Sequence, residues 1–142
     1  MRFLAVDPGK KRVGLAISDP GETFAHPLRV LQRRSGEQVV GEIAEVCRQE
    51  EIGSVVMGLP LNMDGSHGPA AQEAEKLAEQ IRGATGLPVE MWDERLSSVT
   101  AERSMLEADM SRARRKRKID KVAAQVILQG FLDFRKRGGE GK

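Results

Sequence analysis

The order of apolar segments along the chain constrains its fold more than any other feature of the sequence. Two short apolar runs, residues 2–6 and 13–18, flank a turn of proline, glycine and basic residues, and a third run at 23–30 contains Pro27. A proline inside such a run favours an edge strand or an irregular one. The first thirty residues therefore predict an antiparallel meander of three strands.

The next sixty residues alternate between helical and strand patterns. Ser35 and Gln38 have the spacing of a capping box, and apolar residues then recur at helical intervals until Gly53. A continuous apolar run at 54–59, a second helical pattern at 70–81 and a further run at 87–92 follow. This alternation predicts that the fourth and fifth strands run parallel to the first, so that their carboxyl ends meet at one edge of a mixed sheet.

Two more helices are expected after the last strand. One is predicted at 99–106, with Ser97 and Ser98 as candidate caps, and a basic segment separates it from the last helix. The last helix has an apolar stripe that consists of Ile119, Val122, Ala123, Val126, Ile127, Gly130 and Phe134, with Asp120 at its edge. The charged, glycine-rich residues from Arg135 onward are expected to fray. We predict a three-layer α/β sandwich of one domain, residues 1–138, with a flexible tail at 139–142.

The length and composition fit a protein of the cell interior. A chain of 142 residues buries enough surface for one core, and its single cysteine, Cys47, falls on the apolar side of a helical pattern. No stretch approaches the roughly 18 apolar residues of a membrane span, and the amino terminus has no signal-peptide pattern. We expect a cytoplasmic protein that does not bind membranes.

The positive charge of the chain is concentrated in one segment. The formal net charge is only +2, but residues 111–121 contain seven basic residues against Asp120, which gives +6 and leaves −4 for the rest. Such a block is either a solvated loop or a phosphate-binding surface, and the sequence leaves both readings open.

Three groups of carboxylates are expected to meet at one edge of the sheet. Asp7 and the pair Asp93 and Glu94 end strands, and Asp120 lies near the start of the last helix. Each alone is compatible with a turn or a helix terminus. Together they would repel one another and therefore favour a divalent cation. All-oxygen ligands suit Mg²⁺ or Mn²⁺, whereas His26 and His67 are expected at the surface.

A metal site of this composition points to hydrolysis of phosphodiesters. Two ions about 4 Å apart can activate a water and stabilise the leaving oxygen, so that no covalent protein nucleophile is needed. The chain offers no serine elbow and no tyrosine, which agrees with this chemistry.

Four segments carry a resemblance to a known family. They are VDPGKKRVGLAISD at 6–19, GLPLNMDGS at 58–66, DERLSS at 93–98 and KIDKVAA at 118–124. At these residues the chain resembles the YqgF/RuvX family of pre-16S rRNA nucleases or Holliday junction resolvases, within the RNase H-like superfamily. The resemblance extends from end to end, with Ser97 and Ser98 where the family has two threonines.

The resemblance implies an RNase H-like fold and acidic metal ligands at Asp7, Asp120 and the Asp93–Glu94 step. We prefer Glu94 within this step because Trp92 suits the core face and strands alternate, and we leave Asp93 as the alternative. Arg95 would either brace that carboxylate or hold a phosphate. Asn62 and Ser66 are candidate substrate contacts, although a glycine turn with a helix cap at Ser66 explains them equally well. Further phosphate contacts are expected from Lys11, Arg12, Arg112, Arg114, Arg115 and Arg117.

Several functions are compatible with these residues. The preferred one is processing of the 5′ end of pre-16S rRNA, which would bring the protein to ribosomal precursor particles as a monomer. Resolution of Holliday junctions is the alternative, and it would require a homodimer. A non-catalytic nucleic-acid-binding module and an ATP-binding fold of the actin and sugar-kinase type are weaker alternatives; the second rests on the spacing of Asp7, Gly9 and Gly14.

Overall fold

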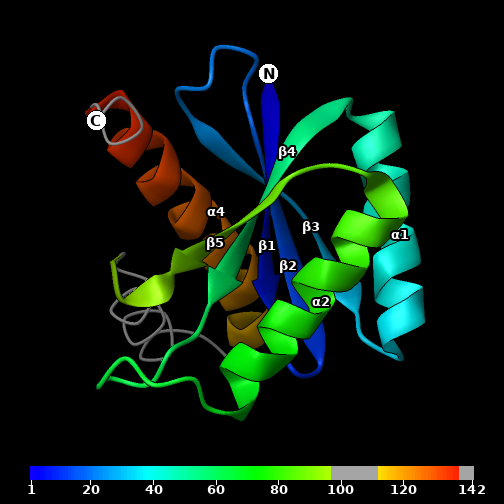
Figure 1. Cartoon of the computed structure of the whole chain (residues 1–142), viewed down its shortest axis with the longest axis vertical. Coiled ribbons are helices and arrows are strands. Elements are labelled where there is room, and N and C mark those ends of the chain that lie inside the picture. The colour runs from blue at the N-terminus through cyan, green and yellow to red at the C-terminus, as the bar shows by residue number, and fades with distance from the viewer. Residues whose placement is uncertain (97–111, 138–142) are drawn as a thin grey trace.

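The computed structural model describes residues 1–96 and 112–137, and for Leu96 and residues 112–121 it describes the backbone alone. The helix expected at 99–106, its caps at Ser97 and Ser98, and the tail at 139–142 lie outside the described residues. The elements, shown in Figure 1, follow one another as β1 (Arg2–Pro8), β2 (Arg12–Ser18), β3 (Ala25–Gln32), α1 (Gly36–Gln49), β4 (Ile52–Leu59), α2 (Pro69–Thr85), β5 (Val89–Asp93), η1 (Glu94–Leu96) and α4 (Arg112–Lys136).

The five strands form one mixed sheet in the order β3-β2-β1-β4-β5. β2 is antiparallel to both β1 and β3, whereas β4 is parallel to β1 and β5 is parallel to β4. The meander and the parallel second half are both confirmed. β1, β3, β4 and β5 consequently end at the same edge of the sheet, which we call the carboxyl edge.

Pro27 marks an edge strand, as predicted. β3 is the outermost strand beside β2, and Pro27 pairs with Ala16 next to a register irregularity. Because proline cannot donate a hydrogen bond to the ladder, its position on an edge avoids an unmade bond inside the sheet. The strand itself begins at Ala25 and ends at Gln32, two residues later than the predicted run.

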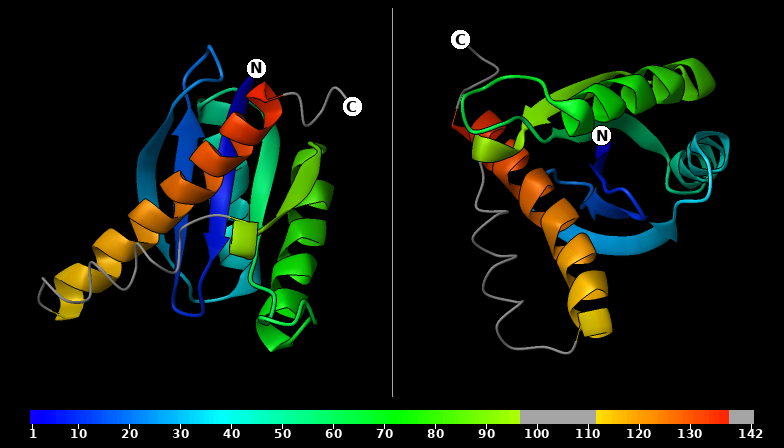
Figure 2. Two further views of the ribbon diagram at one scale, coloured as in Figure 1. Left: turned by 90° about the vertical axis from the view of Figure 1, so that its left-hand side faces the viewer. Right: turned by 90° about the horizontal axis from the view of Figure 1, so that it is seen from below.

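Helices cover both faces of the sheet, which makes the three layers visible in Figure 2. α1 and α2 lie on one face over large aliphatic side chains such as Leu4, Leu15 and Met57. α4 crosses the other face over smaller residues such as Ala5 and Ala16. Strand alternation explains the division, since successive residues of a strand point to opposite faces. We call these the α1/α2 face and the α4 face.

Local signals set the ends of the first two helices. Ser35 caps α1, and its hydroxyl accepts from the backbone N–H of Gln38, whose side chain in turn accepts from the Ser35 N–H. The predicted capping box is therefore confirmed. α2 begins at Pro69 and ends before Gly86, which adopts a left-handed conformation at φ 73°. The N-cap of α2 is Gly68, so the predicted helix cap at Ser66 is wrong.

α4 is longer than the sequence pattern predicted. It begins at Arg112, so the basic segment forms its first turns and is not a connection that precedes it. Arginine and lysine are good helix formers, which allows the helix to extend through a segment with no apolar stripe. The helix continues to Lys136, and Arg135 pairs with Glu22 at 2.8 Å and lies over the Phe3 ring. The expected fraying from Arg135 onward is thus wrong for this part of the helix.

The buried stripe of α4 also differs from the predicted one. Phe134 is 46% exposed and lies against the edge of Trp92. The residues that pack on the sheet are Ala123, Ala124, Ile127, Leu128, Phe131 and Leu132. The buried side of the helix is therefore rotated by about one residue, toward the C-terminal neighbours of the residues in the predicted apolar stripe.

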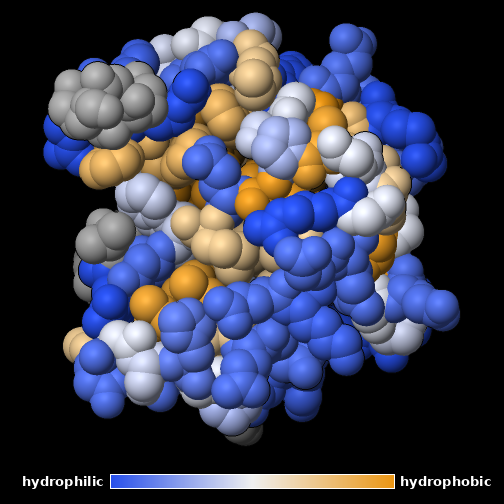
Figure 3. Space-filling model, in the orientation of Figure 1, coloured by the Kyte–Doolittle hydropathy of each residue, from blue (hydrophilic) through white to orange (hydrophobic). Residues whose placement is uncertain are grey.

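The remaining surface is that of an ordinary α/β domain. In Figure 3 the face that α2 presents to the viewer is mostly hydrophilic. Cys47 is buried against the α1/α2 face, as predicted, and burial raises the pKa of its thiol to about 11. Among the helices of the described ranges, none has the length and apolar character to span a membrane.

Candidate active site at the carboxyl edge

Asp7 is a buried carboxylate at the end of β1. Only 3% of the residue is exposed, and strand alternation places it on the α4 face with Phe3 and Ala5. Its neighbour on β2 is Gly14. On the other side, the pairing of Val6 with Met57 brings Gly58 level with Asp7. Asp7 is therefore flanked by two glycines, and neither neighbouring strand contributes a side chain beside it.

Glu94 reaches the same part of the α4 face from β5. It begins η1, directly after the strand, and its carboxylate lies against Gly58. A Cβ atom added at Gly58 would lie 2.9 Å from Glu94 Oε2 and 2.8 Å from Ile127 Cδ1. Only glycine leaves room at this position for both the carboxylate and the helix. Gly58 of β4 consequently lies between Asp7, which is level with it on β1, and the Glu94 carboxylate, which follows β5.

Sequence reasoning did not single out Gly58 as a functional residue. A signal was present, however, because Gly58 interrupts the apolar end of β4 between Met57 and Leu59. A glycine in a strand interior often marks a close approach of another group. Here the approaching group is the candidate catalytic carboxylate.

Asp93 has a different environment from its neighbour Glu94. It accepts hydrogen bonds from Arg95 Nη2 at 2.8 Å, from Arg95 Nε at 3.1 Å and from the Arg95 backbone N–H at 2.9 Å. These bonds to the Arg95 guanidinium hold the pKa of Asp93 below its usual value. Asp93 is thus engaged as the partner of Arg95, and Glu94 is the member of the pair on the α4 face. Arg95 thus braces Asp93, the alternative ligand of the step, and its role as a phosphate contact stays a prediction.

Arg95 also connects β5 to the loop that follows β4. Its Nη1 donates to the Met63 carbonyl at 3.2 Å, and its guanidinium lies beside Gly65, whose φ is 89°. Within the loop, the Asn62 side chain donates to the Ser66 hydroxyl at 2.9 Å, and that hydroxyl donates to Asp64 at 2.6 Å. The hydrogen bonds from Ser66 hold the pKa of Asp64 below its usual value. Asn62 and Ser66 therefore shape the loop at the carboxyl edge.

The basic residues expected to contact phosphate divide into two groups. Lys11 and Arg12 follow the turn after β1, where Lys11 is exposed and Arg12 is half-buried. Arg112, Arg114, Arg115 and Arg117 belong to the first turns of α4. Figure 2 shows this end of the helix extending toward the edge at which β1 ends. Both groups thus lie on elements that approach the carboxyl edge.

The third expected carboxylate belongs to α4. Asp120 is a residue of this helix, and it precedes Ala123, Ala124 and Ile127 by three, four and seven positions. Its side chain is outside the part of the chain that the structure describes. Among the side chains that are described, no group of three acidic, histidine or cysteine residues gathers closely enough to hold a metal. His26 and His67 are exposed, and His67 lies 3.3 Å from Glu75.

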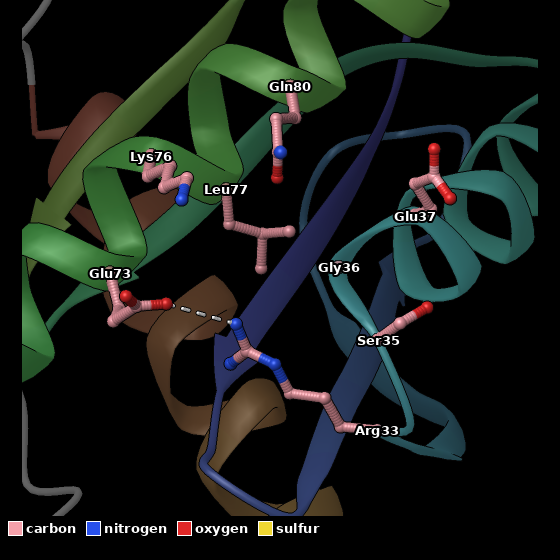
Figure 4. Close-up of a pocket in the computed structure, with 8 residues that line it drawn as sticks. All are labelled: Arg33, Ser35, Gly36, Glu37, Glu73, Lys76, Leu77 and Gln80. Atoms are coloured by element: carbon pink, nitrogen blue, oxygen red, sulfur yellow. Dashed lines mark hydrogen bonds and ion pairs between the residues drawn. The ribbon is translucent and has the colours of Figure 1, made fainter.

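A separate pocket of about 320 Å³ lies between the start of α1 and the middle of α2 (Figure 4). Its lining includes two basic residues, Arg33 and Lys76, and two acidic ones, Glu37 and Glu73, so its formal charge is zero. In Figure 4 the Arg33 guanidinium points toward Glu73. Arg33 also donates to the Gly9 carbonyl at 3.0 Å and so braces the turn that follows Asp7. None of the predicted site residues lines this pocket.

Solved structures with similar folds define the class of the fold. Thermus thermophilus RuvC, determined in complex with a Holliday junction substrate, has a TM-score of 0.63 at 17% identity, with 97% of each chain covered. The fowlpox virus Holliday junction resolvase has a TM-score of 0.57 at 12% identity, covering 94% of this chain and 99% of the other. The protein therefore has an RNase H-like fold of the resolvase kind, as predicted.

Sequence relationships are closer and identify the family. Residues 1–134 match the RuvX family, which is described as Holliday junction resolvase. A Symbiobacterium thermophilum protein named "Putative pre-16S rRNA nuclease" is 49% identical over 135 residues, covering 95% of this chain and 94% of the relative. A Myxococcus xanthus protein of the same name is 48% identical over 133 residues, covering 94% and 88%.

The chain belongs to the RuvX (YqgF) family. It is a nuclease, that is, a hydrolase that acts on phosphodiester bonds of nucleic acid. The family match favours this function over the actin-like and sugar-kinase-like alternative.

Proposed function

We propose that this protein is a metal-dependent nuclease in which Asp7, Glu94 and Asp120 hold Mg²⁺ or Mn²⁺ at the carboxyl edge. The observation that carries the proposal is the position of the Glu94 carboxylate against Gly58, beside the end of β1 where Asp7 is buried. A side chain at Gly58 would fill the space that the carboxylate occupies. Nucleases of the RNase H-like fold generally use divalent metals, and carboxylate oxygens are the ligands that these ions prefer.

The described residues fit such an ion by their chemistry. Asp7 and Glu94 would supply hard oxygen ligands from the two sides of β4, and Asp120 is the candidate third ligand from α4. Cys47 is buried on the opposite face of the sheet and cannot take part. When bound, divalent ions would lower the pKa of an attacking water and stabilise the leaving 3′ oxygen.

The other residues of the edge would position the substrate and the ligands. Arg95 pairs with Asp93 and so neutralises the second carboxylate of the step, which leaves Glu94 to face the reacting phosphate. Lys11, Arg12 and the arginines 112, 114, 115 and 117 would hold the phosphates of the strand, and Asn62 and Ser66 would contact the backbone from the loop. These contacts are sequence-independent, so they bind structured RNA and DNA alike.

The substrate that we propose is the 5′ end of pre-16S rRNA. The support is the name of relatives that are 49% and 48% identical over nearly the whole chain. In this role the protein would act as a monomer on ribosomal precursor particles in the cytoplasm.

A four-way DNA junction is the second candidate substrate. It is favoured by the description of the RuvX family and by the TM-score of 0.63 to a RuvC structure that contains a junction. Symmetric cutting of two strands would require a homodimer, so the oligomeric state during binding helps to separate the two candidates.

The deciding experiment compares cleavage of a pre-16S rRNA leader and a four-way DNA junction in Mg²⁺, in Mn²⁺ and with a chelator. Glu94→Gln and Asp93→Asn form a matched pair, because both remove one carboxylate charge from adjacent residues. We expect Glu94→Gln to abolish cleavage and Asp93→Asn to retain most of it. Sedimentation of the complexes gives the oligomeric state.

Two outcomes would contradict the proposal. If Glu94→Gln kept full cleavage activity and Asp93→Asn lost it, Asp93 and not Glu94 would be the metal ligand. Binding that survives the chelator, together with no cleavage in either metal, would favour the non-catalytic module.

A further inference from the structure

Met63 is an apolar side chain with no place in the core. Among the described residues, the exposed large apolar side chains are Met1, Phe24, Met63 and Phe134, and Met63 is the most exposed of them at 89%. A single exposed apolar residue is common on protein surfaces. This one differs in the loop that carries it and in the place where that loop lies.

The backbone under Met63 is held by hydrogen bonds on both sides. The Asn62 N–H donates to the Ser66 carbonyl at 3.0 Å, and the Gly65 N–H donates to the Asn62 carbonyl at 2.8 Å. The Met63 carbonyl accepts from Arg95 at 3.2 Å. The loop is thus a closed turn with Met63 at its tip, and the side chain points to solvent although the chain beneath it is fixed.

The same bonds join the tip to the candidate active site. Arg95 follows Glu94 directly, and both carboxylate oxygens of Asp93 accept hydrogen bonds from the Arg95 guanidinium. The loop itself begins after Leu59, one residue beyond Gly58. Met63 is therefore held at the carboxyl edge by a network that includes both sequence neighbours of Glu94.

The chemistry of methionine suggests what it contacts there. Its flexible, polarizable thioether packs well on aromatic rings, and proteins insert methionine and similar side chains between bases to unstack them. Aromatic residues, which usually provide such contacts, make up only 4% of this chain, and tyrosine is absent. Trp92, the aromatic residue nearest Glu94 in the sequence, is buried under α4.

We propose that Met63 packs against an unstacked nucleobase next to the phosphodiester that is cut, and so selects distorted or easily opened sites in the substrate. This inference rests on the proposed nuclease function and adds a substrate contact to it. The Asp93–Arg95 pair and the turn at 62–66 hold the side chain in place for this contact.

The test uses the full chain with Met63→Ala, the polar near-isostere Met63→Gln and the apolar control Met63→Leu. Cleavage is measured on a base-paired substrate and on the same substrate with an abasic nucleotide beside the mapped cut. Base stacking is worth about tenfold or more in affinity, so we expect Met63→Ala and Met63→Gln to lower kcat/KM about tenfold on the intact substrate. We expect almost no loss on the abasic substrate and little change for Met63→Leu.

A binding measurement separates this inference from the nuclease proposal. In the Asp7→Asn background, 2-aminopurine beside the cut should brighten on binding as the base unstacks, and Met63→Ala should remove that increase. Equal losses on the intact and abasic substrates, or unchanged brightening with Met63→Ala, would overturn the role of Met63 while leaving the nuclease intact. If the wild type cut neither substrate, the nuclease proposal would fail and the fluorescence change alone would decide the contact.

Discussion

The two faces of the sheet bury different kinds of residue. The α1/α2 face is filled with large aliphatic side chains such as Leu4, Met57 and Leu77. The α4 face also buries Phe3, Val56 and Trp92, but it contains the small residues Ala5 and Ala16 as well. By strand alternation it holds all three of the buried polar residues among those described, Asp7, Ser18 and Ser54. Close packing of large apolar groups stabilises the fold, whereas small residues leave room for carboxylates beside a helix. We therefore expect the α1/α2 face to contribute chiefly to stability and the α4 face to hold the candidate active site.

The largest effect is expected from Asp7→Asn on the α4 face. The amide cannot replace the carboxylate as a metal ligand, so cleavage should fall by about 10³-fold or more, a loss equal to several kcal/mol of transition-state stabilisation. Urea unfolding should show a free energy of unfolding equal to that of the wild type or higher. Undiminished cleavage by the purified variant would remove Asp7 from the mechanism.

Leu77→Ala should give the opposite result on the α1/α2 face. Leu77 is fully buried on α2, and truncation of such a residue costs about 2–5 kcal/mol of stability. The cleavage rate of the protein that remains folded should match the wild type. Unfolding is measured in urea, and cleavage is measured at urea concentrations well below the unfolding midpoint of the variant. If the cleavage rate of Leu77→Ala fell as much as that of Asp7→Asn, stability and catalysis would not be divided between the two faces.

Gly58→Ala should affect both stability and cleavage, because Gly58 lies against both the α4 helix and the Glu94 carboxylate. The added methyl group would lie too close to both Glu94 Oε2 and Ile127 Cδ1, so we expect a loss of about 1–3 kcal/mol in stability. Cleavage should fall by about 10²-fold, because a displaced carboxylate is costly in an active site. Gly83→Ala on α2 is the matched control.

In that control a Cβ meets no atom within 4 Å, so helix propensity should raise stability by about 0.5–1 kcal/mol without changing cleavage. If Gly58→Ala cleaved as fast as Gly83→Ala, Glu94 would not need the space above Gly58.

The smallest effect concerns the pH dependence of Asp93. Because Arg95 lowers the pKa of Asp93 in the folded state, the carboxylate stabilises the fold above its unfolded pKa of about 3.9. That contribution is lost as the pH falls through the lower folded pKa. Asp93→Asn should therefore have a slightly lower urea midpoint at pH 6, and the difference should shrink as the pH falls below the unfolded pKa. A difference in urea midpoint that stayed constant over this pH range would show that packing, and not the charge of Asp93, causes it.

Much of the architecture could be read from the sequence because its signals are local. The capping box of Ser35 and Gln38 involves residues three positions apart, and Pro27 excludes a central strand wherever it occurs. The alternation of strand and helix patterns likewise predicted the parallel strands. Each of these predictions depends on backbone geometry within a short segment, which tertiary packing did not override.

The start of α4 was predicted wrongly, and its buried stripe was predicted only in part, because Ala123 and Ile127 are buried as expected but Phe134 is not. A run of like charges at 112–118 resembles a solvated connection, but helix propensity does not depend on an apolar stripe. Phe134 fits the periodicity, yet the helix turns its neighbours Phe131 and Leu132 to the sheet. Which side of an amphipathic helix is buried depends on the surface that it meets, and one segment alone does not contain that information.

The sequence by itself determined the strand that carries Asp7, the step that contains Glu94 and the edge at which both end. Only the tertiary structure showed that Asp93 pairs with Arg95 whereas the Glu94 carboxylate lies against Gly58, because these contacts form through space. It also showed that the turn at 62–66 is tied to Arg95 and presents Met63. A side chain's residue type and strand position follow from the chain, but its partner depends on which surfaces pack together.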